Sequence, residues 1–111
     1  MPTRIRSYRH NPTHIYENGV YYFITGTVLY HVHILAQASY KEYLQQQLLS
    51  LAPSYGLDLK AWVVLNNHYH ILFHLEKGEN LSRFLQRFHA KTATTFNKWD
   101  NLSGRQVWWN Y

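Results

Sequence analysis

The feature that most constrains the fold is a pair of β-rich segments separated by only two residues. Residues 57–65 read LDLKAWVVL, residues 68–75 read HYHILFHL, and only Asn66 and Asn67 lie between them. Aromatic and β-branched side chains dominate both segments, and such side chains favour strands. Asparagine tolerates the left-handed backbone of a tight turn, so the sequence predicts an antiparallel hairpin.

The second segment of the hairpin separates its side chains by parity. Alternate residues of a strand point to the same face, which places His68, His70 and His74 on one face. The other face carries only apolar and aromatic side chains, namely Tyr69, Ile71, Phe73 and Leu75. In a two-layer fold the apolar face packs against helices, so the histidine face is predicted to be the open one.

The flanking segments complete the fold class. Residues 19–30, GVYYFITGTVLY, predict a strand with a candidate bulge at Gly26. Residues 105–111, RQVWWNY, predict a final strand. With one helix after the first strand and one after the hairpin, the order is β-α-β-β-α-β. This order predicts an α+β, ferredoxin-like fold, in which an antiparallel sheet carries two helices on one face.

Both helices are predicted from apolar spacing and from capping residues. The first follows Ser39, which with Glu42 forms a capping-box pattern, and it ends near Pro53 and Gly56. The second follows Asn80 as its expected cap, and its apolar residues recur at helical spacing as Leu81, Phe84, Leu85 and Phe88.

Composition sets the broad class. The chain of 111 residues is predicted to hold a basic N-terminal arm, 1–18, and one domain, 19–111. Its formal charge of +5 and its 17% of aromatic residues suit a polyanionic partner, although a merely basic protein fits as well. The absence of cysteine excludes thiolate metal sites and agrees with a reducing cytoplasm. No apolar run is long enough for a membrane span or a secretory signal.

Histidine pairs are the first candidate site. Two imidazoles on one strand face, His68 and His70, suit one divalent cation, although an isolated His-x-His is also common on protein surfaces. His74 lies four residues beyond His70, roughly 13 Å along a strand, which is too far to share an ion and disfavours a three-histidine metallohydrolase. The second pair, His31 and His33, falls where the first strand runs into a loop and is the weaker candidate.

A basic ridge is the second candidate site. Arg83, Arg87 and Lys91 recur every four residues on the second helix, opposite its apolar stripe. They suit either a solvated helix face or a phosphate-binding surface to which Arg105 contributes. The four tryptophans suit either the core or base stacking, and most are predicted to be core.

Taken in order, these segments resemble the HUH superfamily of single-strand DNA nucleases, and most closely its single-tyrosine transposases of the REP-associated, IS200-like group. The usual motif of that family is Met-Pro-Asn-His-x-His between two hydrophobic strands. Leu65 and Asn66 stand where the motif has Met and Pro, whereas Asn67, His68 and His70 match it. The resemblance covers nearly the whole chain.

The resemblance implies a function. Such transposases attack a phosphodiester of single-stranded or hairpin DNA with a tyrosine, forming a 5′-phosphotyrosine link, and His68 and His70 would be the catalytic residues that hold Mg²⁺ or Mn²⁺. It also implies a homodimer and a bacterial cytoplasmic protein, nucleoid-associated when bound to DNA. The family nucleophile lies on a helix after the last strand, and Tyr111 is the only tyrosine after Tyr69. We therefore expect a C-terminally truncated chain in which the nucleophile and the third metal ligand are absent, so that its status as an enzyme stays open.

A second class of function fits the same fold. A non-catalytic, ferredoxin-like module for single-stranded nucleic acid would stack bases on the open sheet face. Histidines on the third strand, where such modules carry aromatic residues, argue against it.

Overall fold

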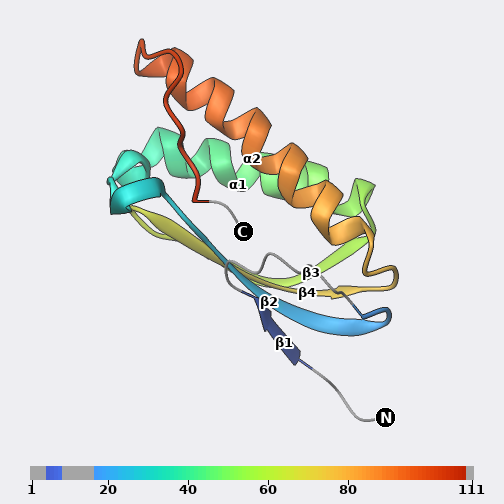
Figure 1. Cartoon of the computed structure of the whole chain (residues 1–111). Helices are drawn as coiled ribbons and strands as arrows, with labels where there is room; N and C mark the ends of the chain where they lie inside the picture. Colours follow the sequence, from blue (N-terminus) through green and yellow to red (C-terminus); the bar gives the residue numbers. More distant parts are fainter. Residues whose placement is uncertain (1–4, 9–16, 110–111) are drawn as a thin grey trace.

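A sheet covered on one face by two helices forms the body of the chain, as Figure 1 shows for the computed structural model, which describes residues 5–8 and 17–109. Its antiparallel strands are β2 (Val20–Thr27), β4 (His68–Leu75) and β3 (Leu57–Val64), in that spatial order. The helices are α1 (Ala38–Ser54) and α2 (Asn80–Trp99). This arrangement confirms the predicted α+β, ferredoxin-like class.

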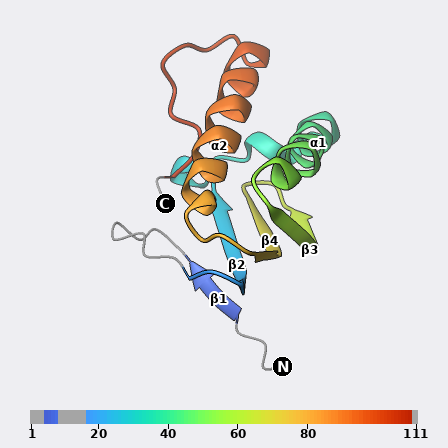
Figure 2. The ribbon, with the colours of Figure 1, turned by 90° about the vertical axis from the view of Figure 1, so that its right-hand side faces the viewer.

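A further strand lies where the sequence predicts an arm. β1 (Ile5–Tyr8) pairs in parallel with residues 21–24 of β2 and extends the sheet at that edge, as Figure 2 shows from the side. Part of the predicted arm is therefore part of the sheet, whereas the domain boundary at residue 18 stays a prediction.

The hairpin is confirmed, but its turn differs from the predicted one. β3 and β4 pair antiparallel, and the Leu65 N–H closes the turn by donating to the His68 carbonyl at 2.8 Å. Neither Asn66 nor Asn67 has a positive φ. The left-handed backbone expected of these asparagines is therefore wrong. They serve the turn instead through hydrogen bonds to the segment that follows β2.

The predicted parity of β4 is confirmed. Tyr69, Ile71, Phe73 and Leu75 are each at most 1% exposed, whereas the histidines that alternate with them are half-buried. These four side chains pack beneath the helices as the centre of the hydrophobic core. The histidine face points away from the helical layer, because the strand sends alternate side chains to opposite sides.

Gly26 forms no bulge, contrary to the sequence-based expectation. It pairs in regular register with Tyr69 across β2 and β4. A Cβ atom at Gly26 would lie 2.1 Å from Cε2 of the Tyr69 ring. The residue is a glycine because the tyrosine ring occupies the space that a side chain would need.

Both helix caps predicted from sequence are wrong. α1 begins at Ala38 without a side-chain capping bond, and Ser39 is exposed. Asn80 is the first residue of α2, and its Nδ2 donates to the carbonyl of Tyr55 at 3.1 Å, so it links the start of α2 to the end of α1 instead of capping a helix. The apolar stripe of α2 is confirmed, since all four of its predicted members are buried: Leu81, Phe84, Leu85 and Phe88.

The predicted final strand is reduced to a single bridge in the described part of 105–111. Trp108 pairs with Val28, and the flanking backbone bonds join Leu29 N–H to the Val107 carbonyl at 2.8 Å and Trp109 N–H to the Thr27 carbonyl at 2.9 Å. Val107 and Trp108 are both buried, although they are consecutive, so this segment does not alternate as a strand does.

The tryptophans are mostly exposed, which corrects the expectation of a core role. Trp108 is 4% exposed, whereas the other three are between 39% and 49% exposed: Trp62, Trp99 and Trp109. Within the described residues, no helix combines the length and the hydrophobicity needed to cross a bilayer.

Candidate metal and nucleic-acid site

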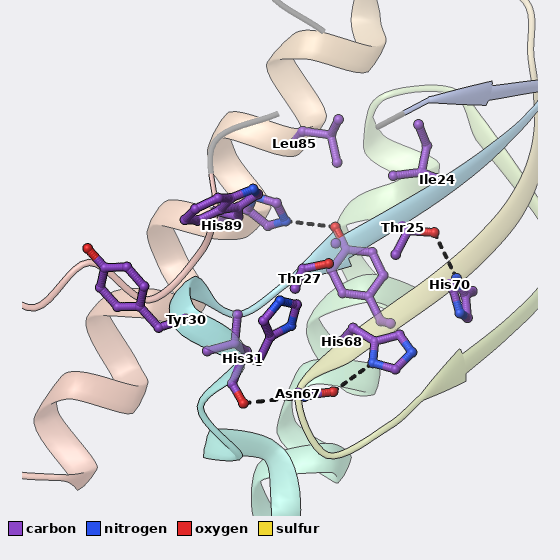
Figure 3. Close-up of a pocket in the computed structure, with 14 residues that line it drawn as sticks. Ile24, Thr25, Thr27, Tyr30, His31, Asn67, His68, His70, Leu85 and His89 are labelled. Atoms are coloured by element: carbon purple, nitrogen blue, oxygen red, sulfur yellow. Dashed lines mark hydrogen bonds between the residues drawn. The ribbon is translucent and has the colours of Figure 1, made fainter. Parts of the chain in front are cut away.

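The paired histidines lie side by side on the open face of β4. The ring centroids of His68 and His70 are 5.0 Å apart, with an interplanar angle of 78°. His68 Nδ1 is 2.7 Å from Asn67 Oδ1, and His70 Nδ1 is 2.8 Å from Thr25 Oγ1 (Figure 3). Each ring therefore uses Nδ1 for a partner within the protein and keeps Nε2 for a ligand. Such hydrogen bonds orient metal-binding histidines.

The tautomer of His68 follows from the amide of Asn67. Asn67 Nδ2 donates to the His31 carbonyl at 3.3 Å, which turns Oδ1 towards His68. The Nδ1 of His68 is then the protonated nitrogen, and Nε2 carries the lone pair. Burial lowers the pKa of His68, and the neighbouring His70 and His31 lower it further. The neutral form that a metal ion requires is therefore favoured.

A cleft of about 650 Å³ contains the pair. It is lined by strand, turn and helix residues with no carboxylate among those described: Ile24, Thr25, Gly26, Thr27, Val28, Tyr30, His31, Asn67, His68, Tyr69, His70, Leu85, His89 and Trp109. A cleft that lacks acidic side chains and carries several histidines suits an anion.

His31 also lines this cleft, although the sequence ranked it with His33 as the weaker candidate pair. The structure brings it to the same cavity as His68, whereas His33 does not line that cavity. Spacing could not show this, because the loop reaches the cleft through the left-handed backbone of Tyr30 and His31, at φ 56° and 57°. The sequence also did not identify Thr25 as a site residue, because its contact with His70 depends on the register between β2 and β4.

The turn that carries the motif is held by Lys41 of α1. Its Nζ donates to the carbonyl of Leu35 at 2.6 Å and to Asn66 Oδ1 at 2.7 Å. The Asn66 carbonyl in turn accepts from Leu35 N–H at 2.9 Å, and the Asn67 carbonyl accepts from Val28 N–H at 2.9 Å. The loop after β2 and the hairpin turn are thereby joined into one support for the histidines.

The core side of the same strand is equally fixed. Tyr69, between the two histidines in sequence, places its hydroxyl 2.7 Å from Nε2 of His89. The ring of His89 stacks on Trp108 at 4.7 Å, and burial lowers the pKa of His89 to about 3. A neutral imidazole in this position supports β4 from the helical side, and the residue also lines the cleft.

His74 stands apart from the pair. Its ring meets Tyr21 edge-on at 5.0 Å, and its Nδ1 is 3.5 Å from a carboxylate oxygen of Glu76. Among the described residues, no cluster of three histidine or acidic side chains has the geometry for one metal ion. A metal held by His68 and His70 would therefore complete its coordination with other groups.

The basic ridge is separate from the cleft. Arg83, Arg87 and Lys91 are exposed on α2, and they do not line the cavity. Their side of the helix is opposite its buried stripe, so the ridge lies on the outer side of the helical layer. Tyr111 lies outside the described residues.

Arg105 is hydrogen-bonded to two residues at the end of α2. Its Nε donates to Asn97 Oδ1 at 2.7 Å and its Nη2 to Asp100 Oδ2 at 2.8 Å. The pKa of Asp100 is lowered, mostly by the Tyr40 hydroxyl that donates to it and also by Arg105. These bonds fasten the end of α2 to the segment that follows it.

Comparison with known proteins identifies the family and a similar fold. The model of a protein family described as "Transposase IS200 like" matches residues 16–111. A solved structure of a REP-associated tyrosine transposase bound to a REP hairpin is similar, with a TM-score of 0.65 and 21% sequence identity. The match covers 87% of this chain and 55% of that one, so the chain spans about half the length of its structural relative. No curated protein matches the chain.

Proposed function

The chain belongs to the IS200-like transposase family, and from this premise we propose that it binds single-stranded or hairpin DNA, with a divalent metal ion held by His68 and His70 against a backbone phosphate. The observation that carries the proposal is the pair of Nδ1 bonds to Asn67 and Thr25, which leave the Nε2 atom of each ring available for a ligand. The solved structure of similar fold is bound to a REP hairpin, which supports a hairpin as the DNA partner.

The residues of the pair fit a metal ion in number of donors and in charge. Two neutral imidazoles supply two ligands, and oxygen atoms of the DNA phosphate or water would supply the others, as Mg²⁺ and Mn²⁺ prefer. A bound ion would supply Lewis-acid chemistry at the phosphate, and His68 and His70 would be the residues that hold it. Asn67 and Thr25 hold the rings in place, and the cleft without described carboxylates admits the anion.

The basic residues would contact the rest of the DNA. We assign Arg83, Arg87 and Lys91 to phosphates that reach the outer side of the helical layer, since all three are exposed. Arg105 would contribute through Nη1, because Asn97 and Asp100 take its other two nitrogens. These contacts position the DNA and carry no sequence information.

The family reaction needs a tyrosine at the metal. Among the described tyrosines, Tyr30 and Tyr69 line the cleft of the histidine pair. Tyr30 lies at the end of that cleft away from His70, with His31 between them (Figure 3). Tyr69 directs its hydroxyl to His89 on the core side of the sheet. Tyr21 pairs with His74, four residues along β4 from His70, or roughly 13 Å. We therefore propose that these 111 residues bind DNA without forming a phosphotyrosine link.

Two measurements test the proposal with a labelled DNA hairpin and Mn²⁺. Binding should weaken at least ten-fold in the double variant His68→Ala/His70→Ala, and His74→Ala, on the same strand face, should bind like the parent. A denaturing gel should show no covalent adduct. An adduct that disappears in Tyr111→Phe or in Tyr30→Phe would overturn the claim that the nucleophile is absent.

The non-catalytic binding module remains the second candidate, because aromatic side chains share the open face with the histidines. Phe23 stacks on His70 at 5.3 Å with an interplanar angle of 19°, and Tyr21 lies next to His74. Binding that persists in EDTA and in the double histidine variant would favour this candidate over the metal-dependent one.

We also propose a homodimer. β3 is the outer strand of the described sheet at one edge, and Val63 on it is 44% exposed. Unpaired strand edges of this kind pair readily with a second copy. Light scattering after size exclusion would show twice the 13.3 kDa mass of the chain, and a monomer at micromolar concentration would refute the proposal.

A further inference from the structure

Tyr30 is held in a costly conformation with its ring in solvent. Its side chain is 79% exposed, and its backbone is left-handed with φ 56°. An aromatic residue in this region is strained, and such strain is kept where the surrounding structure imposes it, often at binding sites. Since burial does not explain the ring, its position calls for a partner outside the chain.

The ring has an aromatic neighbour at the same cleft. Trp109, 49% exposed, meets Tyr30 edge-on at a centroid distance of 6.3 Å. Both residues line the cavity that contains His68 and His70. In the view of Figure 3, Tyr30 lies at the end of the cleft away from His70, with His31 between them.

The aromatic pair is fixed to the elements that carry the histidines. The backbone N–H of His31 donates to the Val28 carbonyl at 2.9 Å, and the His31 carbonyl accepts from Asn67. The backbone N–H of Trp109 donates to the Thr27 carbonyl at 2.9 Å. A ligand that touches the aromatic pair and the histidines together would therefore meet a preorganised surface.

The surroundings define what would bind there. No described carboxylate lines the cleft, His31 and Asn67 supply polar groups, and the chain carries a formal charge of +5. The fitting occupant is a planar group joined to an anion, which describes an unpaired nucleotide. We infer that Tyr30 and Trp109 stack one unpaired DNA base beside the phosphate at the histidine pair. This inference rests on the proposed function, and it adds a base-binding site to the phosphate site.

The test uses the whole chain and a DNA hairpin with a six-nucleotide single-stranded extension, read by fluorescence anisotropy with Mn²⁺ present. Tyr30→Asn removes the ring and keeps a residue that tolerates the left-handed backbone, whereas Tyr30→Phe keeps the ring. Trp62→Leu is the matched control, because Trp62 is 39% exposed but bonds Gln45 of α1 and lies outside the cleft. A second series replaces each base of the extension in turn by an abasic site.

Stacking of one base on an aromatic side chain is worth about ten-fold in affinity. We expect Tyr30→Asn to lose about that factor, and Tyr30→Phe and Trp62→Leu to bind like the parent. One abasic position should weaken the parent equally and leave Tyr30→Asn unchanged. If the parent binds the hairpin but neither Tyr30→Asn nor any abasic site weakens it, the stacking site is wrong and the proposed function stands. If the parent does not bind DNA at all, both are wrong.

Discussion

Replacing Gly26 with alanine tests whether the ring of Tyr69 fixes the register of the histidine strand. The added Cβ would lie 2.1 Å from Cε2, 2.3 Å from Cζ and 2.6 Å from the hydroxyl oxygen of Tyr69. The ring cannot move aside freely, because it is 1% exposed and its hydroxyl is bonded to His89. It also meets Phe88 and Trp108 edge-on at 5.6 and 5.5 Å.

The magnitude follows from these contacts. Forcing extra volume into a packed core costs about 1–3 kcal/mol. A shifted Tyr69 also loses its hydrogen bond to His89, which is worth about 1 kcal/mol. Gly26→Ala should therefore lower the free energy of unfolding by about 3 kcal/mol and the Tm by about 12 °C. Since Tyr69 lies between His68 and His70, the affinity for Mn²⁺ should fall as well, by about ten-fold.

Thermal unfolding followed by circular dichroism measures the first effect, and calorimetric titration with Mn²⁺ the second. In a Tyr69→Leu background, Gly26→Ala should cost less than about 0.5 kcal/mol, because the clashing ring atoms are gone. Gly104→Ala is the control: it has open space and φ 73°, so it should cost about 1 kcal/mol from backbone strain in both backgrounds. A Gly26→Ala chain as stable as the parent would refute the reasoning.

Three further predictions concern the groups that support the site. Thr25→Val removes the partner of the Nδ1 atom of His70 and should weaken Mn²⁺ binding by about ten-fold in calorimetric titration, with little loss of stability. Lys41→Met removes three hydrogen bonds, including that to Asn66, and should lower the free energy of unfolding in urea by about 2 kcal/mol. The pKa of His89 falls from 6.5 to about 3 on folding, so the unfolded chain binds a proton that the folded chain does not. The contribution of His89 to the free energy of unfolding is then fully present above pH 6.5 and decreases below it by at most about 1.4 kcal/mol per pH unit. In urea titrations at pH 4.5 to 7.5, His89→Gln should reduce this pH dependence.

The first of these predictions has a matched control within the chain. Thr27→Val alters the cross-strand neighbour of His68, whose Nδ1 is bonded to Asn67 instead, so metal affinity should not change. An equal loss in Thr27→Val and Thr25→Val would mean that the threonine bond does not orient the ring. An unchanged pH slope in His89→Gln would show that other groups cause the acid sensitivity. For Lys41→Met, unchanged urea stability would show that the turn is held without the lysine.

The strands β2, β3 and β4 and both helices could be predicted because their signals are local, whereas β1 and the single bridge at Trp108 were not predicted. The period of two along 68–75 assigns Tyr69 to the core and His68 to the open face, and the helical period in α2 places Phe84 and Phe88 inward. The predicted caps failed for the opposite reason. Asn80 finds its partner in the carbonyl of Tyr55, 25 residues away, and no short motif encodes a contact of that range.

The sequence by itself determined the hairpin, which side chains of the second strand lie on each face, and the presence of two neighbouring imidazoles. It could do so because alternate residues of a strand point to the same face, so the order of residue types fixes where their side chains lie. Only the tertiary structure decided which groups support those imidazoles. Register between β2 and β4 brings Thr25 to His70, and the left-handed loop brings His31 and Tyr30 to the cleft. The same register explains why residue 26 is a glycine: the ring of Tyr69, 43 residues further along the chain, occupies the space that a side chain would need. These contacts join residues far apart in sequence, so they exist only once packing has fixed the strands against one another.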